Sequence, residues 1–263
     1  MMKGMNRLYP VLAWGKHRIR LSSPPKRGDL QYFYEELIKS SKTYYAFEAI
    51  EQYRKVLRKD KTRVKLQDYG AGSLKHKGKE RTVAGVAASS TSKAKVGAFL
   101  FRLVNHLQPK TIMELGTCLG VSSLYLGMAS RNSKVITLEG DPTLSKLAQQ
   151  QFDQQRLQIQ TVSGNIDQTL LEVLETVEGV DMVFFDANHR YEPTMTYFNQ
   201  CLEKSHKQSV FIFDDIHWSK EMEQAWSEVR GHPSVKVSID LFQIGILFFN
   251  EMGADQKHYT WTL

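Results

Sequence analysis

The sequence has few cysteines, few prolines and no long apolar run, and each shortage excludes a class of protein. Two cysteines in 263 residues, Cys118 and Cys201, do not make the disulfide framework of a small secreted domain. Seven prolines and 17 glycines exclude collagen-like repeats. No apolar run approaches the roughly 20 residues of a membrane-spanning helix, and residues 1–20 lack the apolar core of a secretory signal. We therefore expect a cytoplasmic protein without a membrane span.

Positive charge is concentrated in the first part of the chain. Residues 1–110 hold 24 Lys and Arg against 8 Asp and Glu, whereas residues 111–263 hold 11 against 20. One interpretation is a basic arm that attracts nucleic acid, anionic lipid or an acidic substrate. The other is an ordinary solvated helical surface. The basic residues are scattered, without a run of five like charges, and this favours the second interpretation.

The first third of the chain reads as helices joined by loops. The segment SSPPKRG at 22–28 is typical of a loop. Residues 31–59 show apolar and aromatic residues at helical spacing, with a break near Ser40–Lys42, and predict two helices. Residues 60–91 are rich in Lys and Gly and predict a surface loop. Within it, DYGAGS at 68–73 imitates a glycine-rich cofactor turn, but no apolar helical stretch follows.

From residue 92 the pattern changes to alternating helices and strands. Near-continuous apolar strands separated by helices predict a parallel sheet with helices on both faces. We therefore predict an α/β fold with a doubly wound, mostly parallel seven-stranded sheet at 92–263, preceded by a basic helical N-terminal extension at 1–91. The predicted helices are 92–107, 121–130, 142–155, 165–177, 193–204 and 219–230, and the predicted strands are 111–115, 134–139, 157–164, 180–186, 209–215, 235–241 and 244–250.

Polar side chains follow each of the five parallel strands, at the edge where open α/β sheets bind ligands. The first strand ends in Glu114, Gly116 and Gly120, which makes the spacing E-x-G-x-x-x-G. A dinucleotide site has G-x-G-x-x-G and room for a pyrophosphate, so this spacing disfavours a nicotinamide oxidoreductase. A carboxylate here repels phosphate and attracts a cationic ligand such as S-adenosylmethionine. Glu139 follows the second strand and can accept hydrogen bonds from ribose hydroxyls.

Four segments carry a family resemblance: MELGTCLGVSSLYL (113–126), ITLEGD (136–141), FFDANHRYEP (184–193) and FIFDDIHWS (211–219). With them, residues 92–250 resemble the class I S-adenosylmethionine-dependent methyltransferases, in the branch with the catechol and caffeoyl-CoA O-methyltransferases and their bacterial relatives. The resemblance implies that the methionine part of the cofactor lies along the first turn, its ribose on Glu139 and its adenine near Asn165. The implied cofactor residues are Glu114, Gly116, Thr117, Gly120, Ser122, Glu139, Gly164, Asn165 and Asp186.

The resemblance also implies a metal site and a base. Metal-dependent members hold Mg²⁺ with an Asp after the fourth strand and an Asp-Asn pair after the fifth, and here these positions are Asp186, Asp214 and Asp215. Carboxylates are suitable ligands for such a cation. The base lysine of many members is replaced by His189, which can accept a proton near pH 7. His217 is a second candidate base. A metal-free relative with an Asp-x-x-His segment is the alternative.

The sequence thus predicts an enzyme of class EC 2.1.1, an S-adenosylmethionine-dependent methyltransferase acting on the hydroxyl of a small molecule. The catalytic candidates are His189 and Asp186, and Mg²⁺ is a candidate second cofactor. The basic extension suits an anionic or phenolic acceptor. Two alternatives stay open: a nucleic-acid methyltransferase that uses the basic part, and a non-catalytic interaction protein with this fold. Dimers are common in the resembled branch, so a homodimer is also open.

Overall fold

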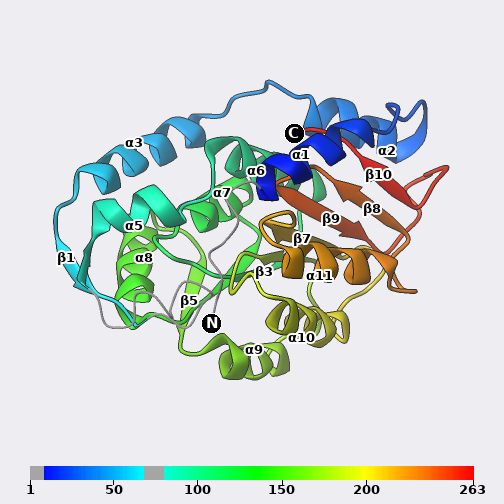
Figure 1. Cartoon of the computed structure of the whole chain (residues 1–263). Helices are drawn as coiled ribbons and strands as arrows, with labels where there is room; N and C mark the ends of the chain where they lie inside the picture. Colours follow the sequence, from blue (N-terminus) through cyan, green and yellow to red (C-terminus); the bar gives the residue numbers. More distant parts are fainter. Residues whose placement is uncertain (1–8, 68–79) are drawn as a thin grey trace.

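A computed structural model describes residues 9–67 and 80–263 and contains one central sheet of eight strands. Five neighbouring strands run parallel, as predicted, and one strand near the far edge is antiparallel to both of its neighbours. The α/β fold with a mostly parallel sheet is therefore confirmed. In spatial order the strands are β10 (His258–Thr260), β8 (Val237–Asp240), β9 (Ile244–Phe248), β7 (Val210–Asp214), β6 (Met182–Phe185), β3 (Thr111–Leu115), β4 (Lys134–Glu139) and β5 (Ile159–Ser163) (Figure 1).

The eighth strand, β10, was not predicted from the sequence. It pairs in parallel with β8 and places Tyr259 opposite Ile239. Tyr259 and the following Trp261 are both buried, while His258 is exposed. Three residues are too few to display the alternation that marks a strand, so the pairing with a distant strand determines this conformation.

Helices cover both faces of the sheet. Successive residues of a strand point to opposite faces, so Ile112 of β3 joins one apolar core and Met113 the other. The core around Ile112 includes α6 (Ala94–Leu107), α7 (Val121–Ala129) and α8 (Pro142–Gln154), and the core around Met113 includes α9 (Ile166–Glu175), α10 (Tyr191–Leu202) and α11 (Lys220–Gly231).

No helix within 9–67 and 80–263 is both long enough and apolar enough to cross a membrane.

The N-terminal segment is helical and contributes to the same core as α6 and α7. The predicted break near Ser40–Lys42 is confirmed, because one helix ends at Ile38 and the next begins at Tyr45. The elements are α1 (Tyr9–Ile19), α2 (Gly28–Phe33), the π-helix η1 (Tyr34–Ile38), α3 (Tyr45–Lys59), β1 (Arg63–Lys65), β2 (Glu80–Thr82) and α5 (Val83–Ser90).

Two N-terminal predictions need correction. Helix α1 was not expected, and the predicted loop at 60–91 contains the β1–β2 pair and helix α5. Three small apolar residues of α5, Val83, Val86 and Ala87, pack into the core. Their run is too short to stand out from the Lys- and Gly-rich sequence before it. The DYGAGS segment at 68–73 lies outside the described residues.

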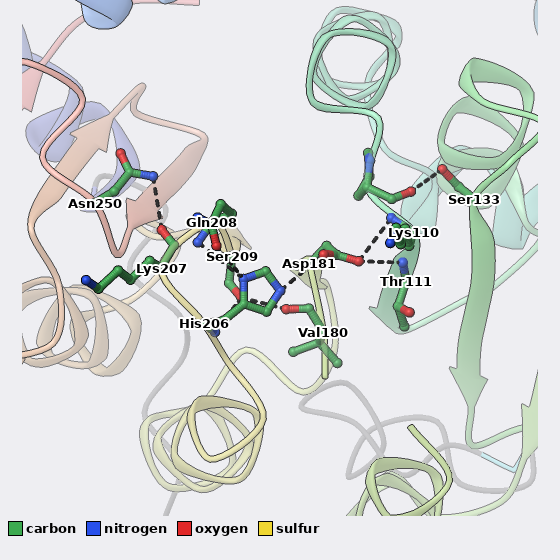
Figure 2. A network of polar contacts seen from close by, with 11 residues as sticks. Lys110, Thr111, Ser133, Val180, Asp181, His206, Lys207, Gln208, Ser209 and Asn250 are labelled. Atoms are coloured by element: carbon green, nitrogen blue, oxygen red, sulfur yellow. Dashed lines mark hydrogen bonds and ion pairs between the residues drawn. The ribbon is translucent and has the colours of Figure 1, made fainter. Parts of the chain in front are cut away.

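A network of polar contacts fixes the starts of three parallel strands (Figure 2). Oδ2 of Asp181 accepts hydrogen bonds from the backbone N–H groups of Lys110 (3.0 Å) and Thr111 (2.7 Å). Nε2 of His206 lies 3.1 Å from the other carboxylate oxygen. The hydroxyl of Ser209 donates to the carbonyl of Val180 at 2.6 Å. These contacts tie β3, β6 and β7 together at their amino ends, opposite the edge where ligands are expected.

Candidate cofactor and acceptor site

The strand order reverses direction between β3 and β6, because the chain passes from β3 outward to β4 and β5 and then returns to β6 and β7. Such a point is where open α/β sheets bind ligands. Gly116 follows β3 and has φ +103°. A Cβ on Gly116 would lie 2.3 Å from the backbone oxygen of Asp186, which follows β6. Glycine therefore allows the two strand ends to lie in direct contact.

The rest of this turn is shaped by close packing. Gly120 has φ +76°, and a Cβ there would lie 2.7 Å from the ring of Phe152 on α8. The N–H groups of Gly116 and Thr117 donate to the carbonyl of Leu138 at 2.9 and 3.2 Å. The hydroxyl of Thr117 lies 2.6 Å from that of Thr137, so its partner is another protein group. The turn is thus preformed by contacts with β4 and α8.

Glu114 lies fully buried beneath the turn. One carboxylate oxygen, Oε2, accepts from the hydroxyls of Ser123 and Thr137, the latter at 2.6 Å. Burial raises the pKa of Glu114 to about 6, although hydrogen bonds from Ser122, Ser123 and Thr137 oppose the rise. The other oxygen, Oε1, has no hydrogen-bond partner among the described residues. This oxygen is the atom of Glu114 that remains for a cofactor.

Glu139 connects the first two strand ends. Its Oε2 accepts from the backbone N–H of Cys118 at 2.7 Å, and its Oε1 accepts from the N–H of Asp141 at 2.9 Å. Two backbone amides therefore fix the carboxylate in one orientation at the end of β4. Cys118 is half-buried, and burial raises the pKa of its thiol, which disfavours a reactive thiolate.

The third strand end is also built as predicted. The N–H of Gly164 donates to the carbonyl of Glu139 at 2.9 Å, which joins the ends of β4 and β5. Asn165 caps α9, and its side chain accepts from the N–H of Asp167 at 3.2 Å. The predicted cofactor residues at the ends of β3, β4 and β5 therefore lie on adjacent strands.

The carboxyl groups of Asp186 and Asp214 lie at the ends of the neighbouring strands β6 and β7 and interact electrostatically. Burial raises the pKa of Asp186 well above its usual range, and the charges of Asp214 and Asp215 add to this effect. Burial and the charge of Asp215 raise the pKa of Asp214 to about 7. A proton or a cation between the two carboxyl groups relieves their repulsion.

The third predicted metal ligand is placed differently. Asp215 has a left-handed backbone with φ +52°. Within residues 9–67 and 80–263, the three carboxylates of Asp186, Asp214 and Asp215 do not form a group whose ligand atoms all lie within 4.8 Å of one another. Oδ1 of Asp214 is buried and has no hydrogen-bond partner among the described residues, and a divalent cation held by Asp186, Asp214 and Asp215 stays a prediction.

His189 lies beside this acidic pair, with Nε2 3.5 Å from Oδ1 of Asp186. Burial lowers the pKa of His189 and favours the neutral imidazole that can accept a proton. Two successive residues here are left-handed: Asn188 has φ +65° and His189 φ +36°. Such conformations cost free energy in non-glycine residues, and they concentrate at functional sites.

His217, the second candidate base, is engaged elsewhere. Its Nε2 lies 2.9 Å from Asp240, and its Nδ1 lies 3.1 Å from Glu223. Because both ring nitrogens already face carboxylates, His217 is not available to a hydroxyl of the acceptor. Of the two tryptophans near β7, Trp226 is buried in the core and Trp218 is exposed.

Two residues beside the acidic pair were not predicted from the sequence. The hydroxyl of Ser92 lies 3.4 Å from Oδ2 of Asp186. The positive charge of the neighbouring Lys93 opposes the rise in the pKa of Asp214. Both precede α6, where a polar stretch before an apolar helix indicates a helix start but does not indicate a site.

Comparisons with known proteins agree with this architecture. A family model for a methyltransferase domain matches residues 113–216. A catechol O-methyltransferase of Niastella koreensis is 34% identical over 137 residues, which are 51% of this chain and 61% of that protein. A catechol O-methyltransferase of Mycobacterium tuberculosis is 27% identical over 128 residues, 47% of this chain and 56% of that protein. The matched segments thus span about three-fifths of the length of these relatives.

Solved structures show the same fold. An O-methyltransferase from Bacillus cereus in complex with S-adenosylhomocysteine has a TM-score of 0.55 at 17% identity and covers 83% of this chain and 96% of its own. The O-methyltransferase TomG from Streptomyces achromogenes in complex with S-adenosylmethionine has a TM-score of 0.55 at 17% identity, covering 83% and 94%. Residues 113–216 thus match a methyltransferase domain, and the chain shares the Rossmann-like α/β fold of these structures. Over about half of its length the chain is similar to catechol O-methyltransferases.

Proposed function

We propose that this chain transfers a methyl group from S-adenosylmethionine to a hydroxyl oxygen of a small molecule with catechol-like chemistry. The observation that carries the proposal is the arrangement of Asp186, Asp214 and His189 beside the glycine turn at the switch point of the sheet. It combines a group that can accept a proton with a pair of carboxylates, next to the residues assigned to the cofactor.

The cofactor side is formed by groups that are already oriented. S-Adenosylmethionine, when bound, supplies an electrophilic methyl group. Two backbone amides hold the carboxylate of Glu139 in the orientation from which we assign it to the ribose hydroxyls. Asn165 and Gly164 lie at the next strand end and are assigned to the adenine. Because these groups do not have to reorganise, they position the methyl group at little entropic cost.

On the acceptor side, His189 acts as the general base. Its imidazole accepts the proton of the acceptor hydroxyl, the oxygen forms a bond to the methyl carbon, and the carbon–sulfur bond breaks with its electron pair staying on sulfur. Asp186 lies within reach of the ring and stabilises the imidazolium that forms. A divalent cation held by Asp186 and Asp214 would lower the pKa of the acceptor hydroxyl.

Calorimetric titration with S-adenosylhomocysteine tests the cofactor site. We expect micromolar binding by the wild-type protein and a loss of roughly tenfold or more in Glu139→Gln, which keeps one oxygen acceptor but loses the charge. Glu172→Gln is the matched control, since Glu172 is exposed on α9. Absence of binding by a folded wild-type protein contradicts the proposal.

Methyl transfer to catechol, measured with Mg²⁺ and again with EDTA, tests the acceptor site. We expect activity that falls on chelation and in Asp214→Asn, while affinity for S-adenosylhomocysteine is kept. Activity that is indifferent to EDTA keeps the methyltransferase and assigns the chemistry to His189 without a metal. Absence of transfer to any hydroxylated acceptor, despite cofactor binding, refutes the proposed reaction.

A further inference from the structure

A second cluster of metal-ligating side chains lies outside the site described above. His17 on α1, His217 after β7 and Asp240 at the end of β8 each offer one ligand atom, and these atoms all lie within 4.8 Å of one another. Nδ1 of His17 lies 3.1 Å from Oδ1 of Asp240, and Nε2 of His217 lies 2.9 Å from Oδ2. His17 and Asp240 are more than nine-tenths buried.

The opposite ring nitrogens determine which atoms face the carboxylate. Nε2 of His17 lies 2.8 Å from the carbonyl oxygen of Trp261, which can only accept, so this nitrogen carries a hydrogen. Nδ1 of His217 lies 3.1 Å from the carboxylate of Glu223 and donates in the same way. In neutral imidazoles the two nitrogens that face Asp240 are therefore bare. A positive charge, either a proton or a metal ion, must lie between them and the carboxylate.

At His17 the geometry favours a metal ion over a proton, whereas the contact of Nε2 of His217 with Asp240 has hydrogen-bond geometry. Although Nδ1 of His17 lies 3.1 Å from Asp240, it makes no hydrogen bond of acceptable geometry with any described residue. An N–H at this position would thus not point at the oxygen. In a metal site the ion lies on the axis of the lone pair and the second ligand lies to the side. Two ligands about 2.0–2.1 Å from one ion, at angles of about 90–110°, are about 2.9–3.4 Å apart. Each nitrogen lies at such a distance from one oxygen of Asp240, His17 from Oδ1 at 3.1 Å and His217 from Oδ2 at 2.9 Å.

We propose that His17, His217 and Asp240 bind one divalent transition-metal ion of the zinc type. Two imidazoles and one carboxylate suit Zn²⁺ better than Mg²⁺, which prefers oxygen ligands. The hydrogen bonds from the two rings to Trp261 and Glu223 are the outer contacts that metal-bound histidines usually make. They fix the tautomer that leaves the ligating nitrogen bare.

The surroundings leave space for a further ligand. A cavity of about 220 Å³ adjoins the cluster and is lined by His17, His217 and Asp240 together with Lys16, Arg20 and Arg230. Three ligands from the protein leave a tetrahedral zinc ion with one open position. A water molecule or a small anion can complete the coordination from this basic cavity.

Binding of the ion also joins three distant parts of the chain. His17 belongs to the N-terminal helix, whereas His217 and Asp240 belong to the carboxyl edge of the sheet. The ion therefore fastens α1 across that edge (Figure 1). It lies at the end of β8, which is separated from β7 and its Asp214 by the one strand β9. This site is independent of the proposed methyl transfer.

Titration of the chelator-treated full chain with Zn²⁺, followed by calorimetry, tests the site. With excess Mg²⁺ present to occupy the acidic pair, we expect one equivalent of Zn²⁺ to bind to the wild-type protein and affinity to fall by about tenfold or more in His17→Ala and in His217→Ala. His206→Ala is the matched control, because His206 also lies 3.1 Å from a carboxylate but outside the cluster. Asp186→Asn should likewise bind as the wild type does, which separates this site from the acidic pair.

Two further measurements keep the test decisive if His17→Ala does not fold. Glu223→Gln leaves all three ligands in place and should weaken Zn²⁺ binding by roughly 10- to 100-fold. Zn²⁺ should raise the melting temperature of the wild-type protein, since it binds only the folded state. The proposal is overturned if the wild-type protein binds no Zn²⁺, if binding is lost in Asp186→Asn, or if His217→Ala binds as the wild type does.

Discussion

Gly116→Ala is the substitution that most directly probes contact between the first and fourth parallel strands. The added Cβ would lie 2.3 Å from the backbone oxygen of Asp186, and φ is +103°. A non-glycine residue in such a conformation costs about 1–3 kcal/mol. The overlap involves backbone, so a strand end must move, which costs about 1–3 kcal/mol more. We expect a loss of about 2–6 kcal/mol in the free energy of unfolding.

Equilibrium unfolding in urea measures this loss. Gly231→Ala is the matched control, because a Cβ on Gly231 meets nothing within 4 Å, and its stability should stay within about 0.5 kcal/mol of the wild type. Gly120→Ala is an intermediate case, since its Cβ would meet the side chain of Phe152, which can rotate. If Gly116→Ala is no less stable than Gly231→Ala, the inferred contact between Gly116 and Asp186 is wrong.

Three further predictions follow from buried polar groups. Burial raises the pKa of Glu114 from 4.5 to about 6, so the native state binds this proton more tightly than the unfolded state does. The free energy of unfolding should therefore fall by about 2 kcal/mol as the pH rises from about 4.5 to 6. Urea unfolding across this range should show that Glu114→Gln lacks this fall. Asp181→Ala leaves two partly exposed backbone amides without their acceptor and should destabilise by about 1–2 kcal/mol in the same assay, with an unchanged stability contradicting the network. His189→Ala should lower kcat by about 10²–10⁴-fold while S-adenosylhomocysteine affinity stays constant, and an unchanged kcat would remove His189 as the base.

The central fold could be predicted because its signals are local. The four inner parallel strands, β3, β4, β6 and β7, are buried on both faces and therefore appear as short apolar runs. The starts of several helices could also be predicted from the sequence. Asp141 accepts from the N–H groups of Thr143 and Leu144, with Pro142 in the first turn, and Asn165 caps α9, as such residues do at helix N-termini.

The missed elements depend on partners that are distant in the sequence. Helix α1 has a weak amphipathic pattern, and its buried residues, Ala13 and His17, are not strongly apolar. It is held by contacts such as that of His17 with the carbonyl of Trp261, 244 residues away. Local spacing cannot register such a contact, so the helix was not predicted.

The same contrast between local signals and distant contacts applies to the candidate site. Residues that follow a strand directly could be placed at the correct edge from the strand assignment alone, and Glu139 and Asp186 are examples. Their electrostatics could not be predicted, because the pKa of Asp186 depends on burial and on Asp214 from another strand. His217 shows the limit: it follows β7 as predicted, yet both ring nitrogens face the carboxylates of Asp240 and Glu223.

The two ends of the described chain support each other at the edge of the sheet that carries the His17 cluster. The N–H of Ser22 donates to the carbonyl of Thr260 at 2.8 Å, and the N–H of Thr260 donates to the hydroxyl of Ser22 at 3.0 Å. The indole of Trp261 donates to the carbonyl of Ser23 at 3.3 Å. Because β10 is only three residues long, these bonds are a substantial part of what orders it. Loss of residues 9–23 should therefore also release β10, so this N-terminal segment is part of the fold.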